Sequence, residues 1–185
     1  AAGVYGGAWL FGDAWVYGDA WVSGDAWVYG NAWVYGNARV YGNARVYGNA
    51  RVYGDARVSG DAWVYGDARV SGNARVYGNA QVYGNAQVYR NAQVVHARHI
   101  STTGPMGSLN STVTLARTDT GHVIFAGCWS GTVDEMVANA RDHKTHWGDH
   151  PKADRKRWRD EFLALAAMFR LRIAEWDDER TEAGR

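Results

Sequence analysis

The chain has 185 residues, one cysteine and a formal net charge of +1. A single cysteine excludes an intramolecular disulfide and a cysteine-rich zinc site, and a charge this close to zero gives no support to a general nucleic-acid-binding module. No apolar run approaches the roughly 20 residues that a membrane-spanning helix needs.

Composition changes abruptly near residue 100. All eleven tyrosines lie before that residue, while every Lys and every Glu lies after it. We therefore predict two domains, 1–100 and 101–185. The N-terminus lacks the charged and apolar regions of a signal peptide, so we expect a cytoplasmic protein. Because the chain begins without Met and already inside a repeat, we expect that it is processed or trimmed.

A six-residue phrase, Gly-Asp/Asn-Ala-x-Val-Tyr/Ser, fills the first domain and recurs in 17 copies between Val4 and Ile100. The two-residue period of a strand places Ala and Val on the inner side and x and Tyr on the outer side. Gly and Asp/Asn tolerate a positive φ, so each repeat ends in a corner. Three corners close a coil of about 18 residues, which predicts about 5 to 6 stacked triangular coils.

This spacing resembles the left-handed parallel β-helix of hexapeptide-repeat proteins, in which an aliphatic residue and a small residue face inward. Here those residues are Val and Ala, over residues 3 to 100. The resemblance implies a single-stranded left-handed coil. Acyltransferases of that family present a histidine beside a loop insertion, and its carbonic anhydrases need three histidines from the coils. This repeat has no insertion, and its histidines, His96 and His99, lie where the pattern decays. We expect a non-enzyme without cofactor or metal, with an acyltransferase-like enzyme as an alternative.

The outward x positions form three columns, because residues 18 apart stack. The columns run Trp9, Trp27, Arg45, Trp63, Gln81, His99; then Trp15, Trp33, Arg51, Arg69, Gln87; and then Trp21, Arg39, Arg57, Arg75, Gln93. Two interpretations stay open: ladders that stabilise neighbouring strands, or a partner-binding surface. The second assigns partner contacts to Trp9, Trp15, Trp21, Trp27, Trp33, Trp63, Arg39, Arg57 and Arg75.

Self-association is the expected use of such a surface, as a homotrimer in the family manner or by end-to-end stacking. The first coil has no polar cap over Trp9, Leu10 and Phe11, which also favours a covering partner. Nucleic-acid binding through Arg and Tyr is a lesser alternative, because Asp side chains at the corners offset the Arg charge.

The second domain begins where the repeat fails, at residues 94–98, with Arg98 in the inward small position as a cap. Residues 101–110 are expected to form a turn-rich connection, followed by a hairpin of strands 112–117 and 122–126. Thr132 and Glu135 form a capping box, which predicts a helix over 132–143. A longer amphipathic helix is predicted over 153–176, with Trp158, Phe162, Leu165, Phe169 and Ile173 near one face. The whole chain is thus predicted to be mainly β, with a small α+β domain.

Gly-Pro-Met-Gly-Ser-Leu-Asn, ending at Asn110, and Gly-Cys-Trp-Ser-Gly-Thr-Val-Asp-Glu, ending at Glu135, resemble the tails of uncharacterised hexapeptide-repeat proteins of phages and prophages. The resemblance implies a phage-type origin. Backbone N–H donors and hydroxyl groups near the start of the helix could bind an anion or a nucleotide. Alternatively, these residues only form turns and cap the helix. The candidate residues are Gly107, Ser108, Asn110, Ser130, Gly131 and Thr132.

The second domain contains two further clusters of candidate residues. Cys128 with His143 or His146 could pair a thiol with a base, although buried packing is the more ordinary role of a lone cysteine. His143, His146 and His150 could bind zinc, or they could lie in a solvated loop.

The expected function is therefore that of a non-enzymatic phage-type assembly or target-binding protein, whose rigid β-helix self-associates and presents the second domain to a target. A counter-defence protein that captures a nucleotide or a host protein is the alternative. Host cytoplasm is then the expected location.

Overall fold

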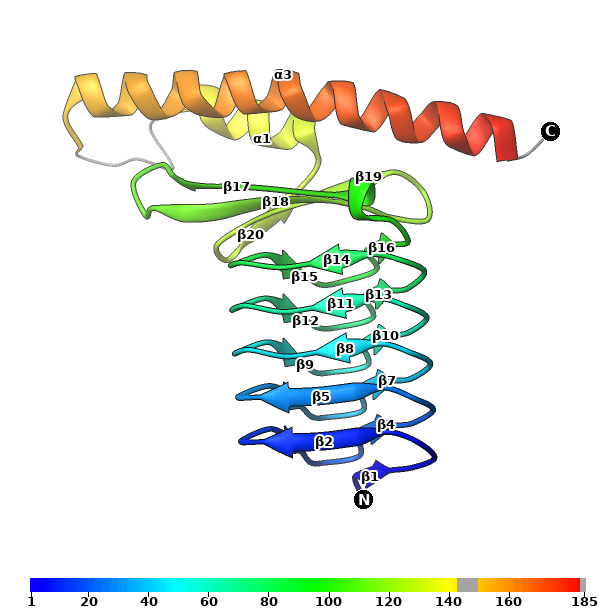
Figure 1. The fold of residues 1–185 in the computed structure, drawn as a ribbon. Helices are drawn as coiled ribbons and strands as arrows, with labels where there is room; N and C mark the ends of the chain where they lie inside the picture. Colours follow the sequence, from blue (N-terminus) through cyan, green and yellow to red (C-terminus); the bar gives the residue numbers. More distant parts are fainter. Residues whose placement is uncertain (143–149, 184–185) are drawn as a thin grey trace. The chain divides into compact units, whose positions relative to one another are not determined.

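The computed structural model describes residues 1–142 and 150–183, with side chains described up to residue 179. The chain folds into two compact units, Ala1–Ile100 and Ser101–Arg185. The first is a parallel β-solenoid of about five turns, and the second is a small sheet with two helices (Figure 1). In Figure 1, β2 (Trp9–Gly12) and β5 (Trp27–Gly30) face the viewer and point left while the chain climbs from its N-terminus, which is the sense of a left-handed coil.

Three parallel sheets form the faces of the solenoid, and each strand pairs with the strand 18 residues further along. The first face holds β1 (Gly3–Val4), β4 (Trp21–Val22), β7 (Arg39–Val40), β10 (Arg57–Val58), β13 (Arg75–Val76) and β16 (Gln93–Val94). The second holds β2, β5, β8 (Arg45–Val46), β11 (Trp63–Val64) and β14 (Gln81–Val82). The third holds β3 (Trp15–Val16), β6 (Trp33–Val34), β9 (Arg51–Val52), β12 (Arg69–Val70) and β15 (Gln87–Val88).

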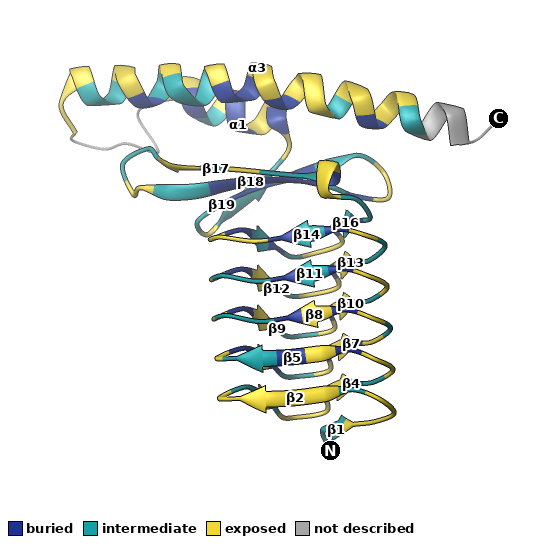
Figure 2. Ribbon diagram, viewed as in Figure 1, coloured by how far each residue is buried: buried dark blue, intermediate teal, exposed yellow. Residues whose placement is uncertain are grey.

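The interior is lined by the Ala and Val of the repeat, with Leu10 in a Val position of the first coil, which confirms the predicted inner face. From Ala20 to Val94 these side chains are buried, and Figure 2 shows this as a blue lining from the second coil onward. The corners from Gly6 to Gly84 turn on glycines with positive φ, for example Gly36 at 71°, and Arg90 takes the same conformation at the following corner, with a φ of 58°. A Cβ at Gly36 would lie 3.0 Å from the backbone nitrogen of Gly54 in the next coil. Glycine is therefore required here both by the turn conformation and by the close stacking of the coils.

The two ends of the solenoid differ. In the first coil the inward side chains of Val4 and Leu10 are about two-fifths exposed, because no described coil lies below them. At the other end a 3-10 turn, η1 (Ala97–His99), interrupts the repeat. The structure reverses two predictions there: His99 is buried and accepts a hydrogen bond from the Val95 N–H at 3.3 Å, whereas Arg98 is exposed. The tighter turn shifts the period by one residue, so the seventeenth repeat does not add a solenoid strand.

The second unit is a four-stranded sheet in the order β17-β18-β19-β20, with both helices on one side of it (Figure 1). The strands are β17 (Ile100–Met106), β18 (Ser111–Arg117), β19 (His122–Ala126) and β20 (Trp129–Gly131), and the helices are α1 (Val133–Arg141) and α3 (Lys152–Ala183). The hairpin β18–β19 and the capping box at Thr132 are as predicted. The expectation of a connection over 101–110 was wrong, because residues up to Met106 pair with β18 and only 107–110 turn.

The hydrophobic core of the second unit lies between its sheet and its two helices. Val113, Leu115 and Ile124 of the sheet pack against Met136 of α1 and Phe169 of α3. The predicted apolar face of the long helix is confirmed, and the helix continues past residue 176, where Trp176 is fully buried.

Candidate functional site

Two tyrosine ladders run along the outside of the solenoid. The rings of Tyr29, Tyr47 and Tyr65 stack 4.8 and 5.0 Å apart and are parallel within 2°. A second ladder joins Tyr17, Tyr35 and Tyr53 at 4.9 Å. Burial in the ladder, with a smaller contribution from the neighbouring tyrosines, raises the pKa of Tyr47 above its usual range. These ladders support the interpretation in which outer side chains stabilise neighbouring strands.

Arginine and tryptophan also stack on one another within the columns. The Arg45 guanidinium lies 5.6 Å from the centre of the Trp27 ring and 5.0 Å from that of Trp63, and Arg51 lies 5.4 Å from that of Trp33. Trp63 is half-buried in this arrangement, and its ring forms an edge-to-face contact with the ring of Tyr47. Arg45 and Trp63 are therefore engaged within the chain.

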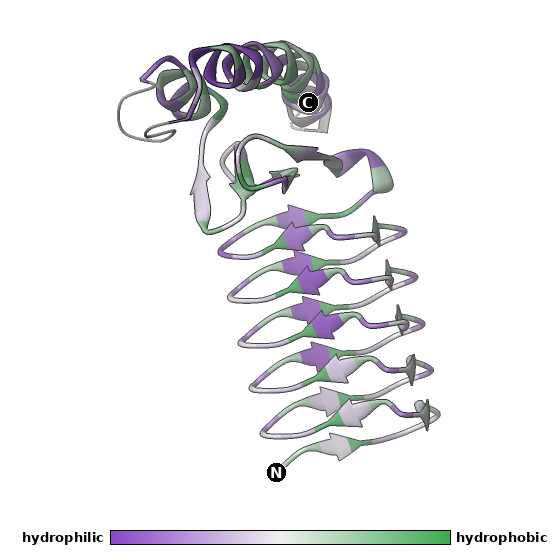
Figure 3. Cartoon of the chain, turned by 90° about the vertical axis from the view of Figure 1, so that its left-hand side faces the viewer, coloured by the Kyte–Doolittle hydropathy of each residue, from purple (hydrophilic) through white to green (hydrophobic). Residues whose placement is uncertain are grey.

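Five tryptophans near the N-terminus form what we call the aromatic girdle: Trp9, Trp15, Trp21, Trp27 and Trp33. Their side chains are 39% to 61% exposed, and they come from all three faces of the first two coils. Figure 3 shows the change along the column, where the outer positions pass from the pale Trp coils to the purple Arg and Gln coils. The girdle therefore surrounds one section of the solenoid instead of covering a single face.

The predicted contact residues Arg39, Arg57 and Arg75 lie in register on the first face. Among the side chains that the structure describes, none of these three guanidinium groups pairs with a carboxylate. An open groove of about 330 Å³ runs beside Arg39 and Arg57, along the corner residues Asp19, Asn37 and Asp55. The side-chain amide of Asn37 donates to Asp55 at 3.0 Å.

The predicted anion-binding residues separate into two groups. Ser130 and Gly131 belong to β20 and pair with Phe125 and Ile124, while Thr132 caps α1. Gly107, Ser108 and Asn110 lie in the turn after β17, where Asn110 has a positive φ of 47°.

Backbone donors at the start of α1 already have partners within the chain. The Thr132 N–H donates to the Glu135 carboxylate at 2.7 Å, and the Val133 N–H donates to Nε2 of His122 at 3.0 Å. The Glu135 N–H donates to the Thr132 hydroxyl at 3.2 Å. This geometry favours the capping role of Thr132 over anion binding.

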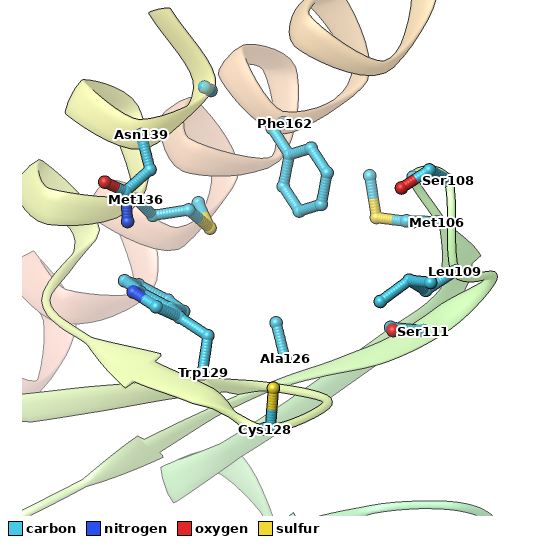
Figure 4. Close-up of a pocket in the computed structure, with 12 residues that line it drawn as sticks. Met106, Ser108, Leu109, Ser111, Ala126, Cys128, Trp129, Met136, Asn139 and Phe162 are labelled. Atoms are coloured by element: carbon cyan, nitrogen blue, oxygen red, sulfur yellow. The ribbon is translucent and has the colours of Figure 1, made fainter. Parts of the chain in front are cut away.

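A pocket of about 210 Å³ opens in the second unit (Figure 4). Its lining comes from one end of the four strands, from the turn over 107–110 and from both helices: Met106, Gly107, Ser108, Leu109, Ser111, Ala126, Cys128, Trp129, Met136, Asn139, Ala140 and Phe162. Sequence reasoning had selected Gly107, Ser108 and Cys128 for other roles and had missed the other lining residues as a site. The motif containing Cys128 and Trp129 was the available signal, but only packing shows that Phe162 lies opposite.

The thiol and histidine candidates are not assembled by the described residues. Cys128 is exposed, and His143 and His146 lie outside the described residues. His150 packs edge-on against Trp158 with ring centres 4.9 Å apart. Within residues 1–142 and 150–179, no group of three His, Cys, Asp or Glu side chains is placed to hold a metal ion. None of the described helices is long and apolar enough to cross a bilayer.

Comparison with known protein families agrees with the solenoid geometry. Six stretches match a family described as the YdcK beta solenoid repeat: 32–48, 38–52, 44–60, 50–66, 68–84 and 80–96. The first unit is thus that of a repeat β-helix protein, and most matched stretches are close to one coil in length. Comparisons with curated proteins and with solved structures each found no match.

Proposed function

We propose that the protein is a non-enzymatic assembly or binding protein, whose solenoid contacts other protein surfaces, first of all further copies of itself, through the aromatic girdle. The observation that carries the proposal is the exposure of five tryptophans in two successive coils. Soluble monomers seldom leave so much aromatic surface in water, and tryptophan is enriched at the centres of protein interfaces.

The size of the girdle supports this use. A tryptophan side chain has on the order of 250 Å² of surface, so five of them at these exposures leave on the order of 600 Å² in contact with water. A stable interface buries about 800 Å² on each partner. The girdle with the adjoining exposed rings of Tyr5, Phe11 and Tyr17 approaches that area only when all three faces are counted, so burying it takes more than one neighbouring copy around the solenoid.

The charges of the first two coils also favour a protein partner over a polyanion. Residues 1–37 contain Asp13, Asp19 and Asp25 but no Lys or Arg. Phosphate backbones are bound chiefly through Lys and Arg, so this section of the solenoid is unsuited to nucleic acid.

Finer features of the proposal rest on resemblance. A homotrimer, a phage-type origin, a location in the host cytoplasm and a host protein as target are all expectations of that kind. Nucleotide capture finds little support, because the donors at the start of α1 bond to Glu135 and His122. An acyltransferase-like enzyme would be revived by saturable binding of coenzyme A.

The proposal is tested by measuring the mass of the full chain in solution by light scattering. We expect a multiple of the 20.4 kDa chain mass at micromolar concentration. The combined variant Trp9→Gln, Trp15→Gln and Trp21→Gln should lower that mass toward the single chain. Gln occupies the same outward position at Gln81, Gln87 and Gln93, so the fold accepts it.

A matched control replaces Arg69 by Gln, which changes the same kind of outward position outside both the girdle and the row of Arg39, Arg57 and Arg75, and should leave the mass unchanged. Circular dichroism establishes that each variant is folded. A wild-type chain that stays a monomer at tens of micromolar would refute self-association.

A further inference from the structure

The pocket of the second unit has walls of one chemical kind. Phe162 enters from α3, Trp129 comes from β20, and the thioethers of Met106 and Met136 complete the sides (Figure 4). Sulfur and aromatic groups both make favourable contacts with the faces and edges of aromatic rings. Such walls fit a flat ring better than a branched or charged molecule.

Polar groups occur only at the margins of this space. Figure 4 shows the Asn139 amide on the side of α1 and the Ser108 hydroxyl on the opposite side. Among the described residues that line the pocket, none is Asp, Glu, Lys, Arg or His. A carboxylate or phosphate would therefore lose its hydration without gaining a cationic partner among these residues, which favours a neutral ligand over an anionic one.

Volume sets the size of the molecule. A protein cavity of about 150 Å³ lined by apolar side chains holds one benzene ring. The volume of about 210 Å³ here exceeds that by roughly the space of a second, fused ring. Small-molecule sites in proteins commonly combine such an apolar space with a few hydrogen-bonding groups.

We propose that this pocket is a binding site for a neutral aromatic molecule of about two fused rings, of indole size, held by the Phe162 and Trp129 rings and oriented by a hydrogen bond to Asn139 or Ser108. The site is independent of the aromatic girdle, since its lining lies wholly within the second unit.

Cys128 makes the pocket measurable. It is the single cysteine of the chain, it is exposed, and its sulfur points toward the pocket in Figure 4. The rate at which a thiol reagent labels the full chain therefore reports on this site alone. Indole bound in the pocket should shield the sulfur, so at three times its dissociation constant indole should slow labelling about four-fold. Indole-3-carboxylate should have little effect.

Two neighbouring positions on α1 supply a matched pair of variants. Asn139 is half-buried and lines the pocket, whereas Ala138 is exposed and does not. In Asn139→Phe the added ring occupies the space, so indole should no longer change the labelling rate. In Ala138→Phe the protection by indole should persist.

Ligand-observed NMR with the unmodified chain provides a second measurement that does not depend on any variant folding. Saturation transfer to indole and not to indole-3-carboxylate is expected. The proposal is overturned if indole neither slows labelling nor receives saturation at about 10 mM, a concentration that would fill even a weak site. Equal protection in Asn139→Phe and in the wild type would also overturn it, since binding would then lie elsewhere.

Discussion

The guanidinium of Arg45 lies 5.0 Å from the centre of the Trp63 ring, one coil further along the same face of the solenoid. A cation–π contact of this kind is worth about 0.5 to 1 kcal/mol at an exposed site. Arg45 makes a second such contact with Trp27 on the coil before it. Outward residues of this column thus interact along the column itself.

Replacing Arg45 by Gln should destabilise the solenoid by about 1 kcal/mol, because both contacts with tryptophan are lost. Urea unfolding followed by circular dichroism measures the change. The control is Arg57→Gln, which removes a charge from between Arg39 and Arg75 on the first face and should be neutral or slightly stabilising. An equal loss in both variants would show that the aromatic contacts contribute nothing.

Alanine at Gly36 should be more harmful than alanine at Gly84. Both glycines have a positive φ, which costs alanine about 1 kcal/mol at either position. Only at Gly36 would the added Cβ press on the next coil, 3.0 Å from the Gly54 nitrogen, whereas nothing lies within 4 Å at Gly84. We expect a further loss of about 1 to 3 kcal/mol at Gly36, measured by urea unfolding. Equal effects would argue against close stacking of the corners.

High pH should weaken the tyrosine ladder. The pKa of Tyr47 is raised by burial in the folded chain, so the unfolded chain ionises first, near its ordinary value of about 10. The stabilisation is complete below that pH and is lost as the pH rises through the higher pKa of the folded state. Thermal melting between about pH 8 and pH 11 measures this loss. Tyr47→Phe, which cannot ionise, should show a smaller loss over the same range.

Salt should strengthen self-association if the copies lie with parallel axes. Such an arrangement brings the Arg39, Arg57 and Arg75 rows of neighbouring chains to the same level, and ions screen their repulsion. Salt does not weaken the apolar contacts by which the girdle would be buried between copies. Light scattering between about 0.05 and 1 M NaCl is expected to show a rising average mass. A falling mass would mean that opposite charges hold the copies together.

Much of the solenoid is predictable because each repeat is locally complete. The inward Val and Ala, the corner glycine and the 18-residue register all follow from alternation and turn chemistry. His99 was placed wrongly because the same reasoning assumes an unbroken period, and the 3-10 turn at 97–99 breaks it.

The second unit was less predictable, since its sites depend on packing between distant segments. Residues 101–106 contain Gly104 and Pro105, which indicate a turn, yet pairing with β18 holds them as a strand. The pocket combines Met106, Trp129 and Phe162, whose spacing in the sequence carries no sign that they meet. The aromatic girdle was predictable in part. The columns in which its tryptophans stand follow from the sequence, whereas the exposure of each tryptophan depends on which residue lies above it in the next coil.

Because of the 18-residue register, the length of the solenoid and the face on which each side chain lies both depend on how many residues precede it. Removing one whole coil, for example residues 38–55, would shorten the column by one strand spacing of about 4.8 Å and leave every later side chain on its own face. Removing a single six-residue repeat would instead turn all later residues by one third of a revolution, so that Trp63 and Arg69 would each move to a neighbouring face. Deleting whole coils therefore changes distance along the axis without changing direction around it, whereas deleting a single repeat changes both.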